Sequence, residues 1–233
     1  MRGGPKRLVV EVRESGRYKA PMIRVDEHPL LEPKVFSSRF PKALADLPTP
    51  STILAYYDLE AEAPLSPDEA TKKSVRDCLR HGGYKPTGRG KPASEYLIKA
   101  VEKEWLSPEK GINLAVDLCN VVSLHSGLPI SVVDAALAKE PLRLGLAEPK
   151  TSYVFNPSGQ EIDIGNLVSL FDEAGPCGGP VKDSQRTKTS DGTTETISVI
   201  WGCQTLSERT DEALRWYREL LASAGVETQL LHS

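Results

Sequence analysis

The sequence predicts an α+β fold with mixed sheets and flanking helices. Helical patterns with capping residues recur along the chain, and short alternating apolar segments lie between them at irregular intervals. This order does not fit a regular βαβ series, which would give a wholly parallel sheet. With 233 residues, 39% of them hydrophobic and 26% charged, the chain is long enough for one large domain or two modest ones with a proper core.

The first third of the chain carries few regular signals. Segment 6–14 alternates apolar and charged residues, which predicts a strand. Segment 26–50 contains five prolines, so we expect loops and short turns there. Segment 51–60 fits a helix or a strand equally well.

Two helices are predicted next. The first begins with Ser66 as N-cap and Pro67 in its first turn, and it ends at residue 80. The second spans 92–106, and its apolar stripe ends at Trp105. Acidic residues early in the first helix and basic residues later in it match the helix dipole.

Later in the chain, glycines end two further helices. Gly127 ends a helix over 112–127, and Gly225 ends an amphipathic helix over 207–225. Between these helices we expect short extended or helical pieces over 130–147, a turn at 156–159 between two strands, the second of which continues through 166–173, a glycine-rich turn at 177–180, and a strand over 196–202.

A polar stripe runs along the helix predicted at 112–127. Asn113, Asp117 and Asn120 stand at i, i+4 and i+7 and so share one face, whereas the other faces are apolar. A helix that is apolar nearly all round is buried, so these polar groups need partners. Either Asp117 and Asn120 form a structural network that holds neighbouring loops, or the stripe lines a pocket.

Two polar loops could bind anions. Loop 80–91 is basic and contains no acid, which suits either a solvated loop or a phosphate-binding segment. Loop 182–191 has no apolar side chain and supplies donors for phosphate or carboxylate and acceptors for amines or hydroxyls. A solvated hairpin loop would have the same composition.

Composition argues against several functions. A net charge of −3 and a pI near 5.9 do not suit a protein that coats nucleic acid non-specifically. No apolar run is long enough to span a membrane, and we expect a cytoplasmic protein. Cys78, Cys119, Cys177 and Cys203 are far apart, which predicts reduced thiols and no metal site. Motifs for nucleotide hydrolysis, dinucleotide binding, zinc proteolysis and α/β-hydrolase chemistry are absent from the sequence.

Two stretches, RGKPASEYLIKAVEKEW and INLAVDLCNVVSLHSGLPISVVD, resemble the B3/B4 domain of the phenylalanyl-tRNA synthetase β subunit, and more closely its freestanding relatives. The family has a helix with Val-Asp-x-x-Asn, a Gly-x-Pro turn and a segment ending in aspartate. The corresponding residues here are Val116, Asp117, Asn120, Gly127, Pro129 and Asp134. Loop 181–195 also looks like the polar loop of the freestanding relatives. The resemblance spans residues 88–222 and implies a B3/B4 fold.

The resemblance has implications for organisation and activity. We expect a B3/B4-like domain over 81–233, with 1–80 either part of the same fold or a small accessory unit. Relatives in the synthetase hydrolyse mischarged tyrosyl-tRNA, which implies a freestanding tRNA-binding and editing domain without aminoacylation activity. Cys119 stands where the synthetase usually has threonine, and Ser131 replaces a histidine, so tyrosine specificity does not transfer.

The resemblance and the two loops together give a set of expected site residues. Asp117 and Asn120 would be catalytic, orienting the aminoacyl group or a water. The expected partner is the acceptor end of tRNA or aminoacyl-tRNA, with no cofactor, no metal and no membrane; the alternative is a non-catalytic module that binds an amino acid or tRNA. The expected substrate-binding residues are Cys119, His125, Ser131, Lys182, Asp183, Ser184, Arg186, Thr187 and Thr189, and the expected RNA-binding residues are Arg80, Lys85, Arg89, Lys91 and Lys188.

Overall fold

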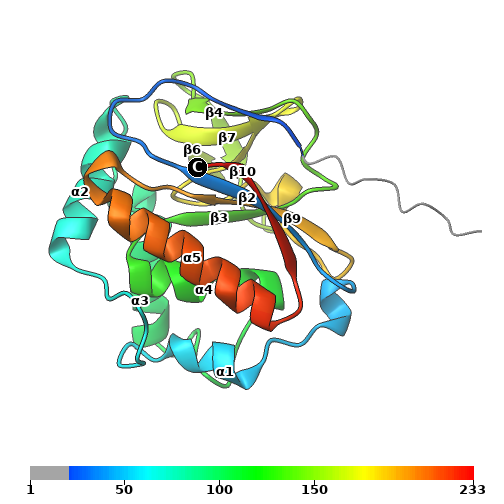
Figure 1. The fold of residues 1–233 in the computed structure, drawn as a ribbon. Coiled ribbons are helices and arrows are strands. Elements are labelled where there is room, and N and C mark those ends of the chain that lie inside the picture. The colour runs from blue at the N-terminus through cyan, green and yellow to red at the C-terminus, as the bar shows by residue number, and fades with distance from the viewer. Residues whose placement is uncertain (1–20) are drawn as a thin grey trace, which may run out of the picture.

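The computed structural model describes residues 21–233 (Figure 1). It has an α+β architecture in which a central antiparallel sheet lies between two helices and a second sheet. The strand predicted at 6–14 lies outside the described residues. Within those residues, each helix is too short or too polar to cross a lipid bilayer.

The central sheet has the strand order β10-β2-β9-β3, all antiparallel. Its strands are β10 (Glu227–His232), β2 (Lys34–Arg39), β9 (Glu195–Ile200) and β3 (Ile130–Asp134). Helices α4 (Leu114–Ser126) and α5 (Ser207–Ser223) pack on one face of this sheet and against each other. This arrangement joins residues from the beginning, middle and end of the chain.

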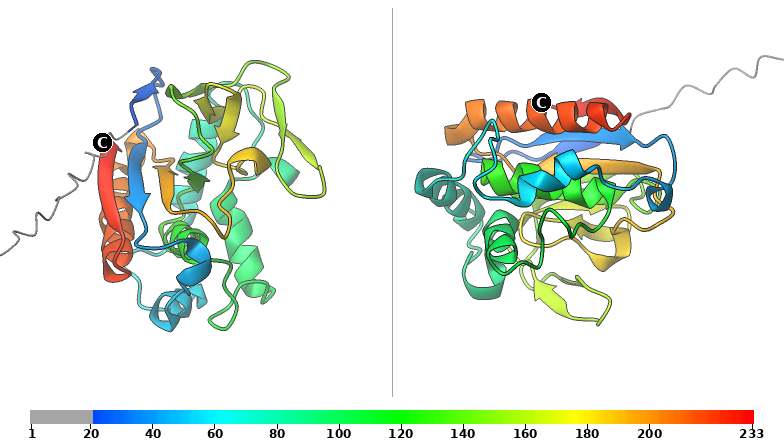
Figure 2. Two further views of the ribbon diagram at one scale, coloured as in Figure 1. Left: turned by 90° about the vertical axis from the view of Figure 1, so that its right-hand side faces the viewer. Right: turned by 90° about the horizontal axis from the view of Figure 1, so that it is seen from below.

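The second sheet is mixed, as the sequence predicted. Its order is β1 (Ile23–Val25), β4 (Leu142–Leu146), β7 (Val168–Asp172) and β8 (Gly175–Gly178), with β1 parallel to β4 and the other pairs antiparallel. A separate hairpin, β5 (Ser152–Val154) and β6 (Glu161–Asp163), extends away from the body of the molecule (Figure 2). The strand predicted to follow the 156–159 turn is therefore two strands, β6 and β7.

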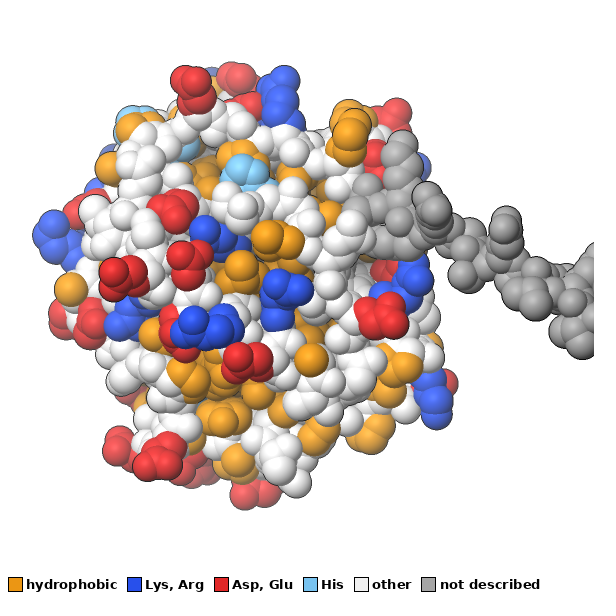
Figure 3. Space-filling view, viewed as in Figure 1, with side chains coloured by type: hydrophobic (Ala, Val, Ile, Leu, Met, Phe, Trp, Pro, Cys, Tyr) orange, Lys and Arg blue, Asp and Glu red, His pale blue; other side chains and the backbone are white. Residues whose placement is uncertain are grey.

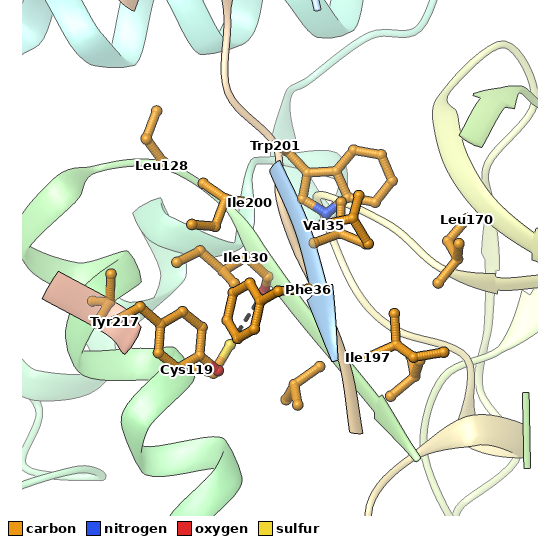
Figure 4. Packing of buried hydrophobic residues seen from close by; sticks show 14 of the residues in the cluster. Val35, Phe36, Cys119, Leu128, Ile130, Leu170, Ile197, Ile200, Trp201 and Tyr217 are labelled. Atoms are coloured by element: carbon orange, nitrogen blue, oxygen red, sulfur yellow. Dashed lines mark hydrogen bonds between the residues drawn. The ribbon is translucent and has the colours of Figure 1, made fainter. Parts of the chain in front are cut away.

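The core forms on both faces of β2. Val35 and Phe36 are both 0% exposed, although their side chains point to opposite faces of the strand (Figure 4). Phe36 meets Tyr217 of α5 edge-to-face, with ring centroids 5.0 Å apart. A strand covered on both faces loses the simple alternation of buried and exposed residues, which explains why segment 26–50 was wrongly predicted to contain only loops and turns.

The remaining helices differ in detail from the predictions. Segment 51–60 is helical, with α1 over Ser51–Leu54 followed by a 3₁₀ turn. Helix α2 spans Glu69–Arg80, and its N-cap is Asp68, whose side chain accepts from the Thr71 backbone N–H at 2.6 Å. The prediction of Ser66 as N-cap was wrong. Helix α3 spans Ala93–Glu102, so Trp105 lies beyond it and is 61% exposed, contrary to its predicted place in the apolar stripe.

Candidate functional site

The polar stripe of α4 divides between two surroundings. Asp117 is 1% exposed. Its carboxylate accepts from the Tyr57 hydroxyl at 2.9 Å, the Thr49 hydroxyl at 2.6 Å and the Ile112 backbone N–H at 2.8 Å. These bonds occupy both carboxylate oxygens and fasten segment 49–57 to α4. The contacts favour the structural alternative for Asp117 over a role in orienting substrate.

Asn120 and Asn113 face different neighbours. Asn120 is half-buried, and its side-chain N–H donates to the Tyr57 hydroxyl at 3.3 Å. Asn113 caps α4 by accepting from the Val116 backbone N–H, while its Nδ2 lies 3.5 Å from the Thr189 hydroxyl. Asn113 rather than Asn120 therefore makes the hydrogen bond between the stripe and the 182–191 loop.

His125 lies among aromatic side chains on another side of α4. Its Nε2 is 2.8 Å from the Tyr56 carbonyl, and its ring packs against Tyr56 and Trp216. Burial lowers the pKa of His125, although the Tyr56 carbonyl and Asp58 oppose that shift. Its described contacts are with α5 and the 55–57 turn, not with the polar loop.

Three residues of the 182–191 loop make hydrogen bonds that fix the position of the loop. Arg186 donates two hydrogen bonds to Asp172, both 2.8 Å long. The Thr187 hydroxyl donates to the Cys177 carbonyl at 2.7 Å, and the Ser184 hydroxyl accepts from the Arg186 backbone N–H at 3.3 Å. The bonds of Arg186 and Thr187 anchor the loop to β7 and β8, whereas the Ser184 bond lies within the loop.

Asp183 occupies a different position in the same loop. Its carboxylate accepts from the backbone N–H groups of Gly179 at 3.1 Å and Val132 at 3.3 Å. Protein atoms surround it on most sides, yet solvent still reaches the residue. Burial raises the pKa of Asp183 to about 6, while the hydrogen bonds from these amides limit the rise. This carboxylate is ionised at neutral pH yet more basic than an ordinary aspartate.

Ser131 and Cys119 lie beside Asp183. The Ser131 hydroxyl accepts from the Trp201 indole N–H at 2.9 Å and donates to the Gly179 carbonyl at 3.1 Å. The Cys119 thiol donates to the Ile130 carbonyl at 3.6 Å. Burial raises the pKa of Cys119, and the Asp183 charge raises it further. The thiol therefore stays protonated and is a poor nucleophile.

Two half-buried lysines belong to the same loop as Asp183. The Lys182 ammonium is 4.8 Å from the ring centroids of both Tyr96 and Phe155. The Lys188 ammonium donates to the Phe155 carbonyl at 2.7 Å. Burial lowers the pKa of both lysines; Lys188 and Arg89 lower that of Lys182 further, whereas Asp183 opposes the shift of Lys188.

The predicted RNA-binding residues do not form one surface. Arg80 pairs with Asp77 at 2.7 Å on α2. Lys91 lines a groove between α2 and α3, whereas Lys85 and Arg89 line a separate cleft beside β6. Lys188 lies with Asp183, as described above. On the face that carries α5, acidic and basic side chains of the described residues are interspersed (Figure 3).

The structure adds groups that the sequence analysis missed. The backbone N–H groups of Val132 and Gly179 have no side-chain signature, because strand pairing and chain direction alone place them. Tyr96 and Phe155 were missed because they were assigned to a helix stripe and a strand. In residues 21–233 no three side chains of His, Cys, Asp or Glu are grouped so as to hold a metal ion.

Residues 88–220 match the model of the family described as the B3/4 domain. The chain belongs to the B3/4 domain family. The match includes α3, α4 and β3–β9, and thus Asp183 together with Ser131 and Lys188. The mixed α+β fold and the predicted resemblance to B3/B4 domains are therefore confirmed.

One solved structure similar to this B3/4 chain is an N-terminal fragment of the phenylalanyl-tRNA synthetase β subunit from Pyrococcus horikoshii. The two share 13% sequence identity with a TM-score of 0.47. The likeness covers 91% of this chain and 52% of the fragment, so the chain spans about half the fragment's length. Among curated protein sequences none is significantly similar to this chain.

Proposed function

We propose that this B3/4 domain binds the aminoacyl end of tRNA and hydrolyses the ester of a mischarged aminoacyl-tRNA. The observation that carries the proposal is Asp183, a half-buried residue with an enclosed carboxylate whose pKa is raised to about 6. A perturbed acid in such a position is typical of a functional site. Family membership and the two neighbouring lysines support the same reading.

Asp183 suits the role of general base. An aminoacyl ester is already activated, so hydrolysis needs a positioned water and stabilisation of the developing oxyanion. Asp183 takes a proton from water as the water oxygen attacks the ester carbonyl carbon. The tetrahedral intermediate then collapses, the bond to the ribose oxygen breaks, and the protonated Asp183 returns the proton to that oxygen. The products are a free amino acid and uncharged tRNA.

Lys188 suits the role of electrostatic stabiliser. Its ammonium interacts with the charge of Asp183, and it is held at 2.7 Å by the Phe155 carbonyl. A fixed cation near the base would lie beside the negative charge that develops on the ester oxygen. Asn113 and Thr189, which meet at 3.5 Å, close the neighbouring end of the loop.

The test is ester hydrolysis by Asp183→Asn. With a panel of mischarged tRNAs, the wild-type protein should release free amino acid, and Asp183→Asn should reduce that rate by at least about 100-fold, as loss of a general base does. Uncharged tRNA should still bind to this variant. Asp46→Asn, which changes an exposed aspartate, is the matched control and should hydrolyse at the wild-type rate. An unchanged rate in Asp183→Asn would refute the role of the base.

The alternative is a binding module without catalysis. It is favoured by the two backbone N–H groups already bonded to Asp183, since such bonds lower the basicity of a carboxylate. In that case Asp183 would hold the ammonium of an amino acid. The two functions separate in one experiment, because a binding module would raise its thermal stability with ligand but leave every mischarged tRNA intact.

A further inference from the structure

Lys182, Lys188 and Arg89 are near enough for their charges to interact, and Asp183 is the acidic group whose charge acts on Lys188. In the described part of the chain, neither Lys182 nor Arg89 forms an ion pair with an acidic side chain. Lys182 lies between the rings of Tyr96 and Phe155, near enough to Lys188 and Arg89 for their charges to act on it. Lys182 and Lys188 are half-buried and Arg89 is exposed, so the three charges repel one another across a partly desolvated surface unless an anion beyond Asp183 offsets them. The charge of the cluster therefore suits the binding of an anion.

A cleft begins where this cluster ends. It has a volume of about 450 Å³ and lies between loop 83–90 and the segment from β6 to residue 166. Arg89 lines the cleft and also belongs to the cation cluster. The Tyr96 hydroxyl donates to the Gly88 carbonyl at 2.8 Å, which fixes the loop to α3, and the Tyr96 ring also contacts Lys182. The cluster and the cleft are thus parts of one continuous surface.

The two walls of the cleft differ in chemistry. Tyr84, Lys85 and Arg89 stand on the loop side. Glu161 and Asp163 stand on the hairpin side. An aromatic ring offers a stacking surface for a base, and carboxylates accept hydrogen bonds from the exocyclic amines of cytosine and adenine. Uracil presents a carbonyl oxygen at the same position, which carboxylates would repel.

We infer that the cation cluster and the cleft form one path for the single-stranded 3′ end of RNA, with phosphates on Lys182, Lys188 and Arg89 and an amine-bearing base in the cleft. This inference deepens the proposed function, on which it rests for the identity of the strand. The CCA sequence that ends tRNA consists of amine-bearing bases only. The carboxylates of the cleft therefore select against uracil, and the cations hold the backbone.

The test uses fluorescently labelled, uncharged RNA hexamers that end in CCA or in UUU. Wild-type protein should bind the CCA-ended RNA at least about fivefold more tightly in fluorescence anisotropy. Arg89→Met and Lys182→Met should weaken binding of both RNAs, and each should reduce the salt slope by about 0.7. Glu161→Ala should reduce the preference for CCA, because Asp163 remains in the cleft. Arg215→Met, which changes an exposed residue of α5, is the matched control and should leave binding unchanged.

Two outcomes would overturn the inference. One is equal affinity of the wild-type protein for the two hexamers. The other is Arg89→Met and Lys182→Met variants that keep a native circular dichroism spectrum and bind like the Arg215→Met control. Because these RNAs carry no aminoacyl ester, the result is independent of the proposed hydrolysis. A protein that prefers CCA-ended RNA but leaves every mischarged tRNA intact would contradict the proposed hydrolysis and leave this inference standing.

Discussion

Tyr57 donates a hydrogen bond of 2.9 Å to Asp117, across 60 positions of the chain. The same hydroxyl accepts from Asn120 at 3.3 Å, so one phenol links two members of the α4 stripe. This side of α4 is fastened to the 49–57 segment, whereas Asn113 at the helix start meets Thr189 of the polar loop. Helix α4 therefore separates a structural network from the candidate site around Asp183.

Tyr57→Phe should destabilise the protein by about 1–3 kcal/mol, because it removes a buried hydrogen bond to a charged carboxylate. Urea unfolding followed by circular dichroism measures the change. Tyr56→Phe is the matched control, since the Tyr56 ring packs against His125 and Trp216 and phenylalanine keeps those contacts. Equal loss of stability in the two variants would contradict a specific contribution from the bond between Tyr57 and Asp117.

Arg186→Met should destabilise the fold rather than act only on ligand binding. Asp172, whose side chain is 0% exposed, would lose both hydrogen bonds from the guanidinium. Loss of one partner of a fully buried pair costs about 3–5 kcal/mol, but water can reach the Arg186 side, so we expect about 2 kcal/mol. Thermal and urea unfolding give the value. The double variant Arg186→Met/Asp172→Asn should recover part of the loss, and a double variant no more stable than Arg186→Met would contradict the pairing argument.

Gly127→Ala should destabilise the end of α4 by about 1 kcal/mol. Gly127 has φ of 71°, and an added Cβ would lie 3.1 Å from the Thr71 methyl group. Gly192→Ala is the matched control, because an added Cβ there has nothing within 4 Å. The two variants are compared by urea unfolding. A neutral Gly127→Ala would mean that α2 moves away from the helix end at little cost.

Helix ends were predictable because their signals are local. Gly127 and Gly225 end their helices with positive φ, as their positions after apolar stripes indicated. Strands β2 and β10 were not predicted, because β2 pairs with β9 and β10, which lie more than 150 residues later in the chain. Strand β8 reads as a glycine-rich turn and becomes a strand only through its pairing with β7. Non-local pairing leaves little trace in a short window of sequence.

The candidate site was only partly predictable, because composition and spacing are local signals whereas tertiary contacts are not. Loop 182–191 was recognisable from composition, but composition could not separate Asp183 from Arg186. Their roles differ because Asp183 receives backbone N–H groups from Val132 and Gly179, whereas Arg186 meets the enclosed Asp172. The α4 stripe was recognisable from its spacing, yet Asp117 is enclosed because segment 49–57 folds over it. Only tertiary contacts distinguish these cases.

Hydrolysis should depend on pH through Asp183, whose pKa is raised to about 6 by burial. The base is active when ionised, so the rate should be constant near pH 7–8, fall to half near pH 6 and keep falling below it. Protonation of Asp183 does not itself unfold the protein. Its folded pKa lies above the ordinary value of 3.8, so the folded state binds this proton more tightly than the unfolded chain does.

The measurement is the initial rate of amino-acid release between pH 5 and pH 8, with circular dichroism recorded at each pH. Loss of rate with an unchanged spectrum, reversible on return to pH 7.5, is the expected result. Asp183→Glu should retain part of the rate and shift the midpoint of the profile, because a longer carboxylate leaves the amides of Val132 and Gly179. A profile with the wild-type midpoint in Asp183→Glu would assign the titration to another group and remove Asp183 from the role of base.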